Sequence, residues 1–394
     1  MKITIAKALT FNGILYLIVL FLIIWNNLQI EKPTIPFNTA IFYVLILYLL
    51  YRKRKLSPSN TINNTPILLK VLLLGLLMLV FKIQIDENYS TQILSFFPIF
   101  LVAICLEKAT KQDLMLSRFA FLFFVLLNCC LIFYERKTMT VLLWNSEDYA
   151  LGRNDITDLT MFRASGFTGH PVLGGFLLSI ELAFVQLSRL NQKVKYVFTV
   201  LIFFALLCVN SRANILLSAF VSIYLFRDAI ISKKNRIIKI LLISLAFFFF
   251  YNLITTTDYG GRLINHESGL DDSSTMARFE VFSVFDYINW NQLLWGDLGL
   301  SDYLMAVMGL AGIENGYIVL VLKYGLIFGG LLIYLLTKYQ WQALHIYSKE
   351  GRLILFFLFI ILANTNPHIA HGVPWVFWVT SYYLLRPSFI KNNI

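Results

Sequence analysis

A glycine-rich segment that begins at Arg163 combines a cation with backbone that can approach an anion closely. From 163 to 175 it reads Arg-Ala-Ser-Gly-Phe-Thr-Gly-His-Pro-Val-Leu-Gly-Gly. Glycines such as Gly166 and Gly174 let backbone amides come near a ligand, and Pro171 suits the first turn of a helix whose dipole attracts negative charge. The segment therefore predicts an anion site. The alternative is a tight turn whose glycines pack helices, with Arg163 reaching toward lipid headgroups.

Two further arginines, Arg212 and Arg278, are candidates for a functional role because of their surroundings in the sequence. Arg212 occupies the short turn Asn-Ser-Arg-Ala-Asn at 210–214, between two apolar runs, where a charge is costly unless it faces protein or water. Arg278 follows an acidic cluster and stands close to Glu280. Because arginine presents a planar fork of donors that binds phosphate bidentately, these residues and Arg163 predict a site for a phosphorylated or pyrophosphorylated substrate. The alternatives are headgroup anchoring for Arg212 and a local ion pair for Arg278.

Glu314 is the leading candidate for a general base, and His170 is the second. Glu314 stands where a long loop re-enters the apolar sequence, a partly desolvated place that suits proton transfer. Its neighbour Asn315 is placed to orient a sugar or a phosphate. The alternative for Glu314 is an acid that complements a helix dipole. No two histidines have metal-ligand spacing within a helix, so the sequence assigns neither a metal nor a cofactor.

The composition around these residues is that of a membrane protein. Of the 394 residues, 58% are hydrophobic and 14% are charged, and the mean hydropathy is +0.71. Soluble domains have roughly 45–50% apolar and about 25% charged residues, so a water-soluble enzyme is excluded. Abundant Phe and Tyr exclude a disordered chain. The four cysteines fall inside apolar runs without metal-ligand spacing and are interpreted as small buried hydrophobes.

Apolar runs predict an all-α, polytopic membrane protein with about 12 transmembrane helices, forming a single transmembrane domain over residues 1–394. Several runs are shorter than the ~20 residues that cross a bilayer without tilt, so their ends extend into flanking residues. The runs lie at 10–28, 37–51, 67–83, 92–106, 114–134, 171–187, 196–209, 213–226, 240–254, 316–336, 353–363 and 374–385.

The distribution of positive charge predicts the orientation of the chain. If the N-terminus is cytoplasmic, most of the 33 Lys and Arg residues fall in inner loops, as the positive-inside rule requires. Both termini are therefore expected in the cytoplasm. The net charge of +11 follows from this topology, and no zinc or RNA-binding motif accompanies it, so no nucleic-acid partner is predicted.

Two outer loops, 135–170 and 255–315, are much longer than the others and contain the candidate site residues except Gly174 and Arg212. Loops of this length usually have a function or are disordered, and the aromatic residues and helix-forming stretches of these two favour order. In the second loop the apolar positions 279, 282, 285 and 288 keep helical spacing. We expect an amphipathic helix there, which either lies on the outer membrane boundary or caps a cavity.

These features resemble the O-antigen polymerase class (Wzy type) and the related O-antigen ligases, which are membrane glycosyltransferases. The resemblance rests on an Arg, ten residues and a Gly from Arg163 to Gly174, on the Ser-Arg hairpin at Arg212, and on the region from Trp295 to Tyr317. It covers roughly residues 150–335. Two features differ from the family: a second Arg-ten-Gly element is absent, and the His-Asn pair of the ligases is replaced by Glu314 and Asn315.

The resemblance implies a reaction at the periplasmic face of the bacterial inner membrane. A glycan held on undecaprenyl pyrophosphate is transferred to the non-reducing end of another lipid-linked repeat unit, without a metal. Arg163, Arg212 and Arg278 would bind the pyrophosphate, and Gly166, Gly174 and Asn315 would contact substrate. The implied partners are the undecaprenyl-pyrophosphate-linked oligosaccharide, membrane lipids, a chain-length regulator and a flippase. Transfer to lipid A-core, as in a ligase, and transport by a polysaccharide flippase are the alternative functions.

Overall fold

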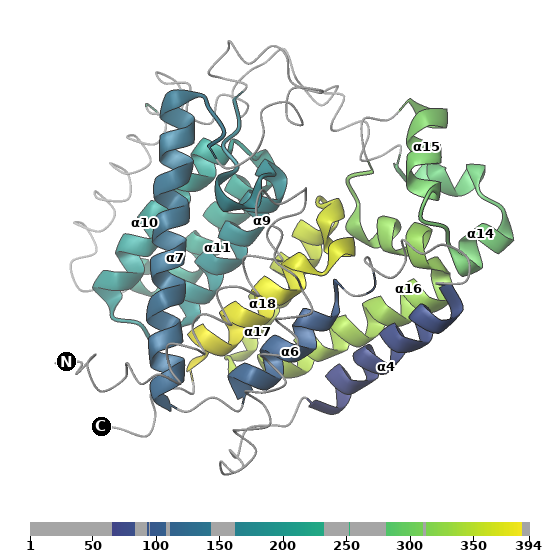
Figure 1. Cartoon of the computed structure of the whole chain (residues 1–394). Helices are drawn as coiled ribbons and strands as arrows, with labels where there is room; N and C mark the ends of the chain where they lie inside the picture. Colours follow the sequence, from purple (N-terminus) through teal and green to yellow (C-terminus); the bar gives the residue numbers. More distant parts are fainter. Residues whose placement is uncertain are drawn as a thin grey trace. The chain divides into compact units, whose positions relative to one another are not determined.

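The computed structural model describes the chain in several stretches, and every regular element within them is a helix (Figure 1). The described residues are 65–82, 93, 95–107, 111–142, 162–231, 252, 281–309 and 313–387. The all-α prediction is thus confirmed for these residues. Arg278 and the predicted spans at 10–28 and 37–51 lie outside them, as does the span at 240–254 except for residue 252.

The chain forms two compact units, each of which is described by itself. Unit 1 contains Met1–Phe123 and Ser273–Ile394, and unit 2 contains Phe124–Asp272. The boundary falls within helix α7 (Lys111–Thr138). A single transmembrane domain over residues 1–394 stays a prediction.

Unit 2 is built around helix α9 (Pro171–Leu187), in which nearly every residue is buried. Helices α10 (Gln192–Val209) and α11 (Arg212–Ile231) pack against it and against one another (Figure 1). Side-chain hydrogen bonds join α9 to α11, among them Ser218 Oγ to Ser179 Oγ at 3.0 Å and Gln186 Nε2 to Ser222 Oγ at 2.9 Å. Such bonds are typical between membrane helices, because buried hydroxyl and amide groups need partners. The 3-10 helix η2 (Gly166–Thr168) precedes α9.

Unit 1 surrounds helix α18 (Val373–Leu385), all of whose residues are buried. Helix α18 packs against α6 (Phe97–Glu107), and α4 (Thr65–Lys82) lies alongside α16 (Gly316–Ala343), as Figure 1 also shows. The remaining elements are η4 (Val281–Tyr287), α14 (Trp290–Trp295), α15 (Leu300–Met308), η5 (Leu344–Ile346), α17 (Lys349–Ala363) and η6 (Pro367–His371).

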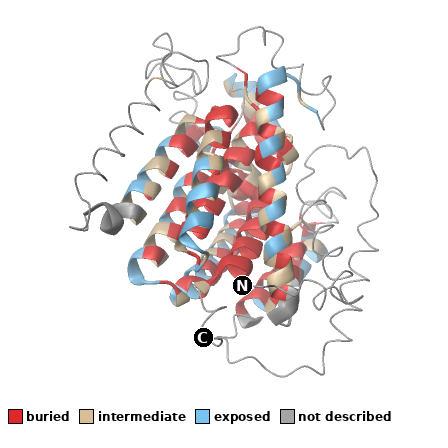
Figure 2. Ribbon diagram, turned by 90° about the vertical axis from the view of Figure 1, so that its left-hand side faces the viewer, coloured by how far each residue is buried: buried red, intermediate tan, exposed pale blue. Residues whose placement is uncertain are grey.

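Several helices are long and apolar enough to cross a membrane. They are Leu114–Thr138, Gln192–Val209 and Gly316–Ile346, and Pro171–Leu187 and Arg212–Leu225 are shorter apolar helices. Figure 2 shows exposed and buried residues on the same helices, and many of the exposed side chains are apolar. Apolar side chains on the outer faces of long apolar helices fit a lipid surrounding, which is consistent with a multi-pass membrane protein.

Helix α16 is interrupted at Gly325, a break that the predicted run at 316–336 did not include. The φ angle of Gly325 is +79° and its ψ angle is 164°, a conformation outside the helical region. The chain bends so sharply that a Cβ on Gly329 would lie 2.7 Å from the carbonyl oxygen of Leu320. In a straight helix, residues nine apart are separated by about 13 Å along the axis. The bend therefore folds the segment from 316 to 324 back on the segment that follows it.

The predicted amphipathic helix near 279–288 has a different form in its described part. Residues from Val281 to Tyr287 form a 3-10 helix, and Val281 and Val284 face the protein while Phe282 and Phe285 are exposed. A 3-10 helix has three residues per turn, so Phe282 and Phe285 form a straight exposed stripe, while Val281 and Val284 lie on a buried face.

Candidate functional site

The loop that contains Arg163 is held in place by a carboxylate at the end of α7. Glu135 is fully buried, and its Oε2 accepts hydrogen bonds from the backbone N–H groups of Ser165 and Gly166, both at 2.8 Å. Its Oε1 accepts a bond of 3.5 Å from Leu142 N–H. A buried carboxylate needs such donors, because an uncompensated charge in the protein interior is very costly. Glu135 thus fixes the backbone that follows Arg163.

Two more α7 side chains bind the same loop. Arg136, also fully buried, donates to the carbonyl oxygen of Phe162, and Asn128 accepts from Phe167 N–H at 3.0 Å. Arg136 falls within the predicted outer loop at 135–170, whereas α7 continues through Thr138 and includes it. The predicted loop at 135–170 accordingly begins several residues later than expected.

The glycines of this loop allow close approach between parts of the chain. Gly166 has a φ of +57°, and a Cβ there would overlap Asn128 Oδ1 and lie 2.8 Å from Ile132. A Cβ on Gly174 would lie 3.0 Å from Thr168 Oγ1. Both glycines are buried. These contacts match the packing alternative for the glycines, and a direct role in binding substrate stays a prediction.

Helices α9 and α11 begin at the same end of unit 2. His170 is the residue before α9, and Pro171 occupies its first turn. Close to both starts, Asn214 of α11 lies against Gly175 of α9, and Ser179 Oγ donates to Asn214 Oδ1 at 3.3 Å. The positive ends of two helix dipoles therefore lie close together.

Arg163 and Arg212 are brought to this end by the backbone. Ala164 N–H donates to the carbonyl oxygen of Cys208 at 3.2 Å, near the end of α10. The chain then turns through Asn210, in the left-handed conformation, and starts α11 at Arg212. Both arginine side chains are partly exposed. The structure thus places the backbone of Arg163 and Arg212 at one end of unit 2, and the third predicted arginine, Arg278, lies outside the described residues.

Glu314 and Asn315 lie in unit 1, at the start of α16. Asn315 caps the helix, because its Oδ1 accepts from Tyr317 and Ile318 N–H, both at 3.1 Å. Its Nδ2 donates to Asn364 Oδ1 at the end of α17, also at 3.1 Å. Glu314 precedes this cap and is partly exposed. Asn315 thus has a structural role, and its contact with substrate stays a prediction.

The start of α16 packs tightly on η6. A Cβ on Gly316 would overlap Ile369 and the carbonyl oxygen of Asn366, and it would lie 3.0 Å from the carbonyl oxygen of Ala363. The fully buried side chain of Asn366 accepts from His368 N–H at 2.9 Å. Glu314 and the η6 histidines therefore lie on segments that touch.

His368 and His371 are uncharged at neutral pH. Burial, and then the positive charge of Lys323, lowers the pKa of His368 to about 4. Burial lowers the pKa of His371 to about 3, with further contributions from Lys323 and His368. The ring centroids of the two histidines are 6.1 Å apart. A neutral imidazole both donates and accepts hydrogen bonds, so this cluster can bind hydroxyl groups.

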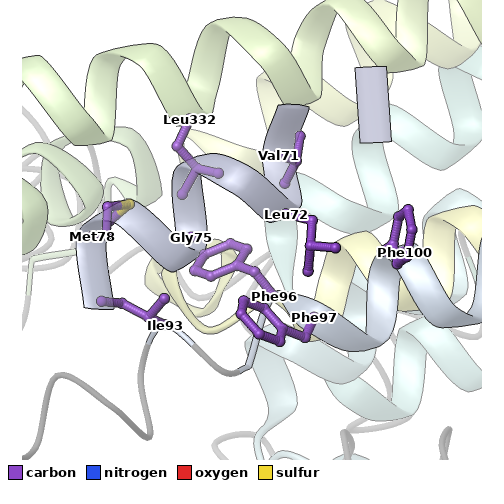
Figure 3. A pocket seen from close by; sticks show the side chains of 9 residues that line it. All are labelled: Val71, Leu72, Gly75, Met78, Ile93, Phe96, Phe97, Phe100 and Leu332. Atoms are coloured by element: carbon purple, nitrogen blue, oxygen red, sulfur yellow. The ribbon is translucent and has the colours of Figure 1, made fainter. Parts of the chain in front are cut away.

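Metal-ligand groups and pockets with polar linings are two further features that could form a site among the described residues. No group of three or more His, Cys, Asp or Glu side chains that could hold a metal ion occurs among the described residues. A pocket between α4, α6 and α16 is lined by apolar side chains, including Phe97 and Leu332, together with Gly75 (Figure 3). None of its lining residues can transfer a proton or bind an anion.

Sequence reasoning missed the α7 side chains that hold the Arg163 loop. Asn128 and Glu135 are seven residues apart, which places them on one face of a helix. A polar residue in an apolar run that shares its face with a carboxylate is a signal that could have been used. The partners of the α7 side chains in the Arg163 loop lie 26 or more residues away and could not be identified from spacing.

The chain matches no model of a protein family, and no curated protein matches it.

Proposed function

We propose that the protein is a bacterial inner-membrane glycosyltransferase that polymerises lipid-linked glycan repeat units, an O-antigen polymerase with about 12 transmembrane helices. The observation that carries the proposal is the arrangement at one end of unit 2. There, Arg163 and Arg212 lie near the starts of α9 and α11, connected by the hydrogen bond from Ala164 to Cys208. Two guanidinium groups and two positive helix ends suit a pyrophosphate.

In the proposed reaction, the hydroxyl oxygen of the acceptor sugar attacks the anomeric carbon of the donor glycan. The bond between this carbon and the pyrophosphate oxygen breaks, and undecaprenyl pyrophosphate leaves. Arg163, Arg212 and Arg278 stabilise the charge on the leaving group, an effect that contributes several kcal/mol in such sites. Glu314 is the leading candidate for the base that accepts the proton of the acceptor hydroxyl, and His170, the residue before α9, is the second.

Activity of the purified full chain tests the proposal. The protein is reconstituted in liposomes with a synthetic lipid-pyrophosphate repeat unit, and the products are separated on a gel. A ladder of products supports polymerisation. Transfer only to added lipid A-core supports the ligase alternative, and movement of the lipid across the bilayer without new glycosidic bonds supports the flippase alternative.

Substitution of the arginines identifies the site. Arg163→Ala and Arg212→Ala should each lower the rate at least about 100-fold, because each removes a charge-assisted contact with the leaving group. Arg189→Ala is the matched control, since Arg189 is exposed beyond the opposite end of α9. If either site variant polymerises at the control rate while folded, that arginine does not bind the pyrophosphate.

A further inference from the structure

Exposed aromatic side chains gather on the segment from 281 to 309 of unit 1. Trp290 is 77% exposed, Phe282 60%, Tyr303 57% and Tyr287 54%. Phe285 and Trp295 are also exposed, while Val281, Val284, Leu300 and Leu304 face the protein. Large aromatic residues are costly in water in such number, so this face is expected to contact something less polar.

The charge of the segment narrows the choice of partner. Its charged residues are Asp286, Asp297 and Asp302, and it contains no Lys or Arg. An anionic partner such as nucleic acid or an acidic peptide would be repelled. Trp and Tyr are enriched where membranes meet water, because their rings are apolar and their N–H and O–H groups are polar.

Helix lengths locate the membrane boundary beside this segment. The apolar stretch Gly316–Ile346 has 31 residues and as one helix would be about 46 Å long, whereas the hydrocarbon core is about 30 Å thick. The part that follows the break at Gly325 is about 31 Å long, which matches the core. Helix α4, with 18 residues, is about 27 Å long.

Helix α4 and the part of α16 that follows the break end at the same height along the proposed membrane normal, next to Gly325. The ring centroids of Phe81, next to the last residue of α4, and Phe328, just after the break, are 6.2 Å apart. Trp295 lies at the same level, 6.2 Å from Phe328. Three rings from three elements thus surround the break.

The segment is attached to the break by backbone contacts. Gly296 lies directly against Gly325, and a Cβ on either residue would overlap the other segment's backbone. Lys82, the last residue of α4, donates to the carbonyl oxygens of Trp295 and Gly296, the latter at 3.1 Å. Asp297 N–H donates to the carbonyl oxygen of Leu322 at 2.8 Å, so a carbonyl freed by the break is paired.

We infer that residues 281–309 form an interfacial platform, which lies on the membrane surface with its aromatic side chains among the lipid headgroups and glycerol groups. Lys82 and Gly325 mark the membrane boundary. Only the part of α16 after Gly325 crosses the bilayer, and the part before it folds back toward α17 and η6. Because aromatic rings and not cations make the contact, neutral lipids suffice for it.

Depth-dependent quenching of an attached fluorophore tests this inference. Single cysteines replace Phe282, Trp290, Asp286 or Leu331 in the full chain after its four native cysteines have been substituted, and the labelled protein is reconstituted in phosphatidylcholine vesicles. Asp286 is an exposed polar position on the same 3-10 helix as Phe282, and Leu331 is an exposed position on α16 below the proposed boundary.

We expect labels at 282 and 290 to be quenched about twofold more by a nitroxide at the headgroup than by one deep in the acyl chains. The label at 331 should show the reverse order, and the label at 286 should respond to aqueous iodide. Added anionic lipid should leave the quenching at 290 unchanged. Strong iodide quenching at 282 and 290 without lipid quenching would show a surface that faces water or a protein partner, and would overturn the inference. Equal deep quenching at 290 and 331 would also overturn it, because the segment would then lie within the hydrocarbon.

Discussion

The two regions that contain the predicted site residues are held together by different chemistry. In unit 2, two fully buried charged side chains, Glu135 and Arg136, bind the backbone of the Arg163 loop. In unit 1, neutral amides hold the segments near Glu314: the Asn315 side chain is bonded to Asn364, and the Asn366 side chain is bonded to His368 N–H. A cationic loop benefits from a nearby carboxylate, whereas a cluster of neutral imidazoles next to Lys323 does not need one.

The difference predicts which region is more sensitive to the loss of one side chain. Removing one buried charged side chain leaves several polar groups without hydrogen-bond partners. Removing one amide side chain leaves only one or two such groups. Unit 2 should therefore depend strongly on a single residue, and unit 1 on the fit between its backbone segments.

The largest effect is expected for Glu135→Ala. The substitution leaves the buried N–H groups of Ser165 and Gly166 without their acceptor and should lower the free energy of unfolding by about 3–5 kcal/mol. Thermal unfolding of the detergent-solubilised chain measures it. Asp286→Ala, at an exposed carboxylate, is the control and should change stability by less than about 0.5 kcal/mol. A Glu135→Ala protein as stable as the control would show that the loop is held by other contacts.

The second largest effect is expected for Gly316→Ala, which tests the backbone fit in unit 1. The new methyl group would overlap Ile369 and the carbonyl oxygen of Asn366, so a loss of about 2–3 kcal/mol is expected. Gly330→Ala in the same helix is a matched control, because its Cβ would meet only Leu326 at 3.9 Å. Alanine should stabilise that position by up to about 1 kcal/mol. Equal losses at both positions would refute the tight contact between α16 and η6.

A smaller effect is expected from pH, and only in unit 1. The pKa values of His368 and His371, about 4 and about 3, lie below the ordinary value of 6.5, so the unfolded chain binds more protons below neutrality. Stability is fully present above pH 6.5 and falls as the pH is lowered, by about 1–2 kcal/mol for each histidine at pH 5.

Substitution separates this pH effect from others. The double variant His368→Gln, His371→Gln should lose less stability between pH 7 and pH 5 than the unmodified chain, as measured by its unfolding midpoint. His345→Gln, at an exposed histidine, should keep the original pH dependence. If the double variant responds to pH like the His345 control, the two histidines are not buried in the neutral form.

The smallest effect is expected for Asn315→Ser. Serine retains a cap acceptor for Tyr317 and Ile318 N–H but loses the donor to Asn364, which should cost about 1 kcal/mol. Asn289→Ser changes a similar cap of α14 that has no bond to another element and should cost less than about 0.5 kcal/mol. Unfolding midpoints of both variants provide the comparison, and an equal cost at both caps would mean that the Asn315–Asn364 bond contributes nothing.

Much of the helical layout could be predicted from composition and local pattern. The run at 171–187 coincides with α9, because Pro171 suits a first helical turn and the following apolar residues have no interruption. The break in α16 could not be predicted in this way. Gly325, Gly329 and Gly330 stand in the same apolar run, and only the contact with Gly296 distinguishes the first of them.

The residues of the candidate site could be named from the sequence, and their joint role stays a prediction. The types of Arg163, Arg212 and Glu314 and their positions at the ends of apolar runs are local properties, so they could be recognised from the chain alone. Whether the side chains meet depends on contacts between distant segments, such as the hydrogen bond from Ala164 to Cys208. The buried state of Arg136 depends on the same kind of contact.

Hydrophobicity, charge and chain-local propensity add up along the sequence, and so they already specify a helical protein with helices apolar enough for a membrane. Packing does not add up in this way, because it requires residues tens to hundreds of positions apart to fit at atomic distance. The tertiary structure therefore decided that Gly166 and Gly174 contact protein, that Glu135 anchors the Arg163 loop, and that α16 turns back at Gly325.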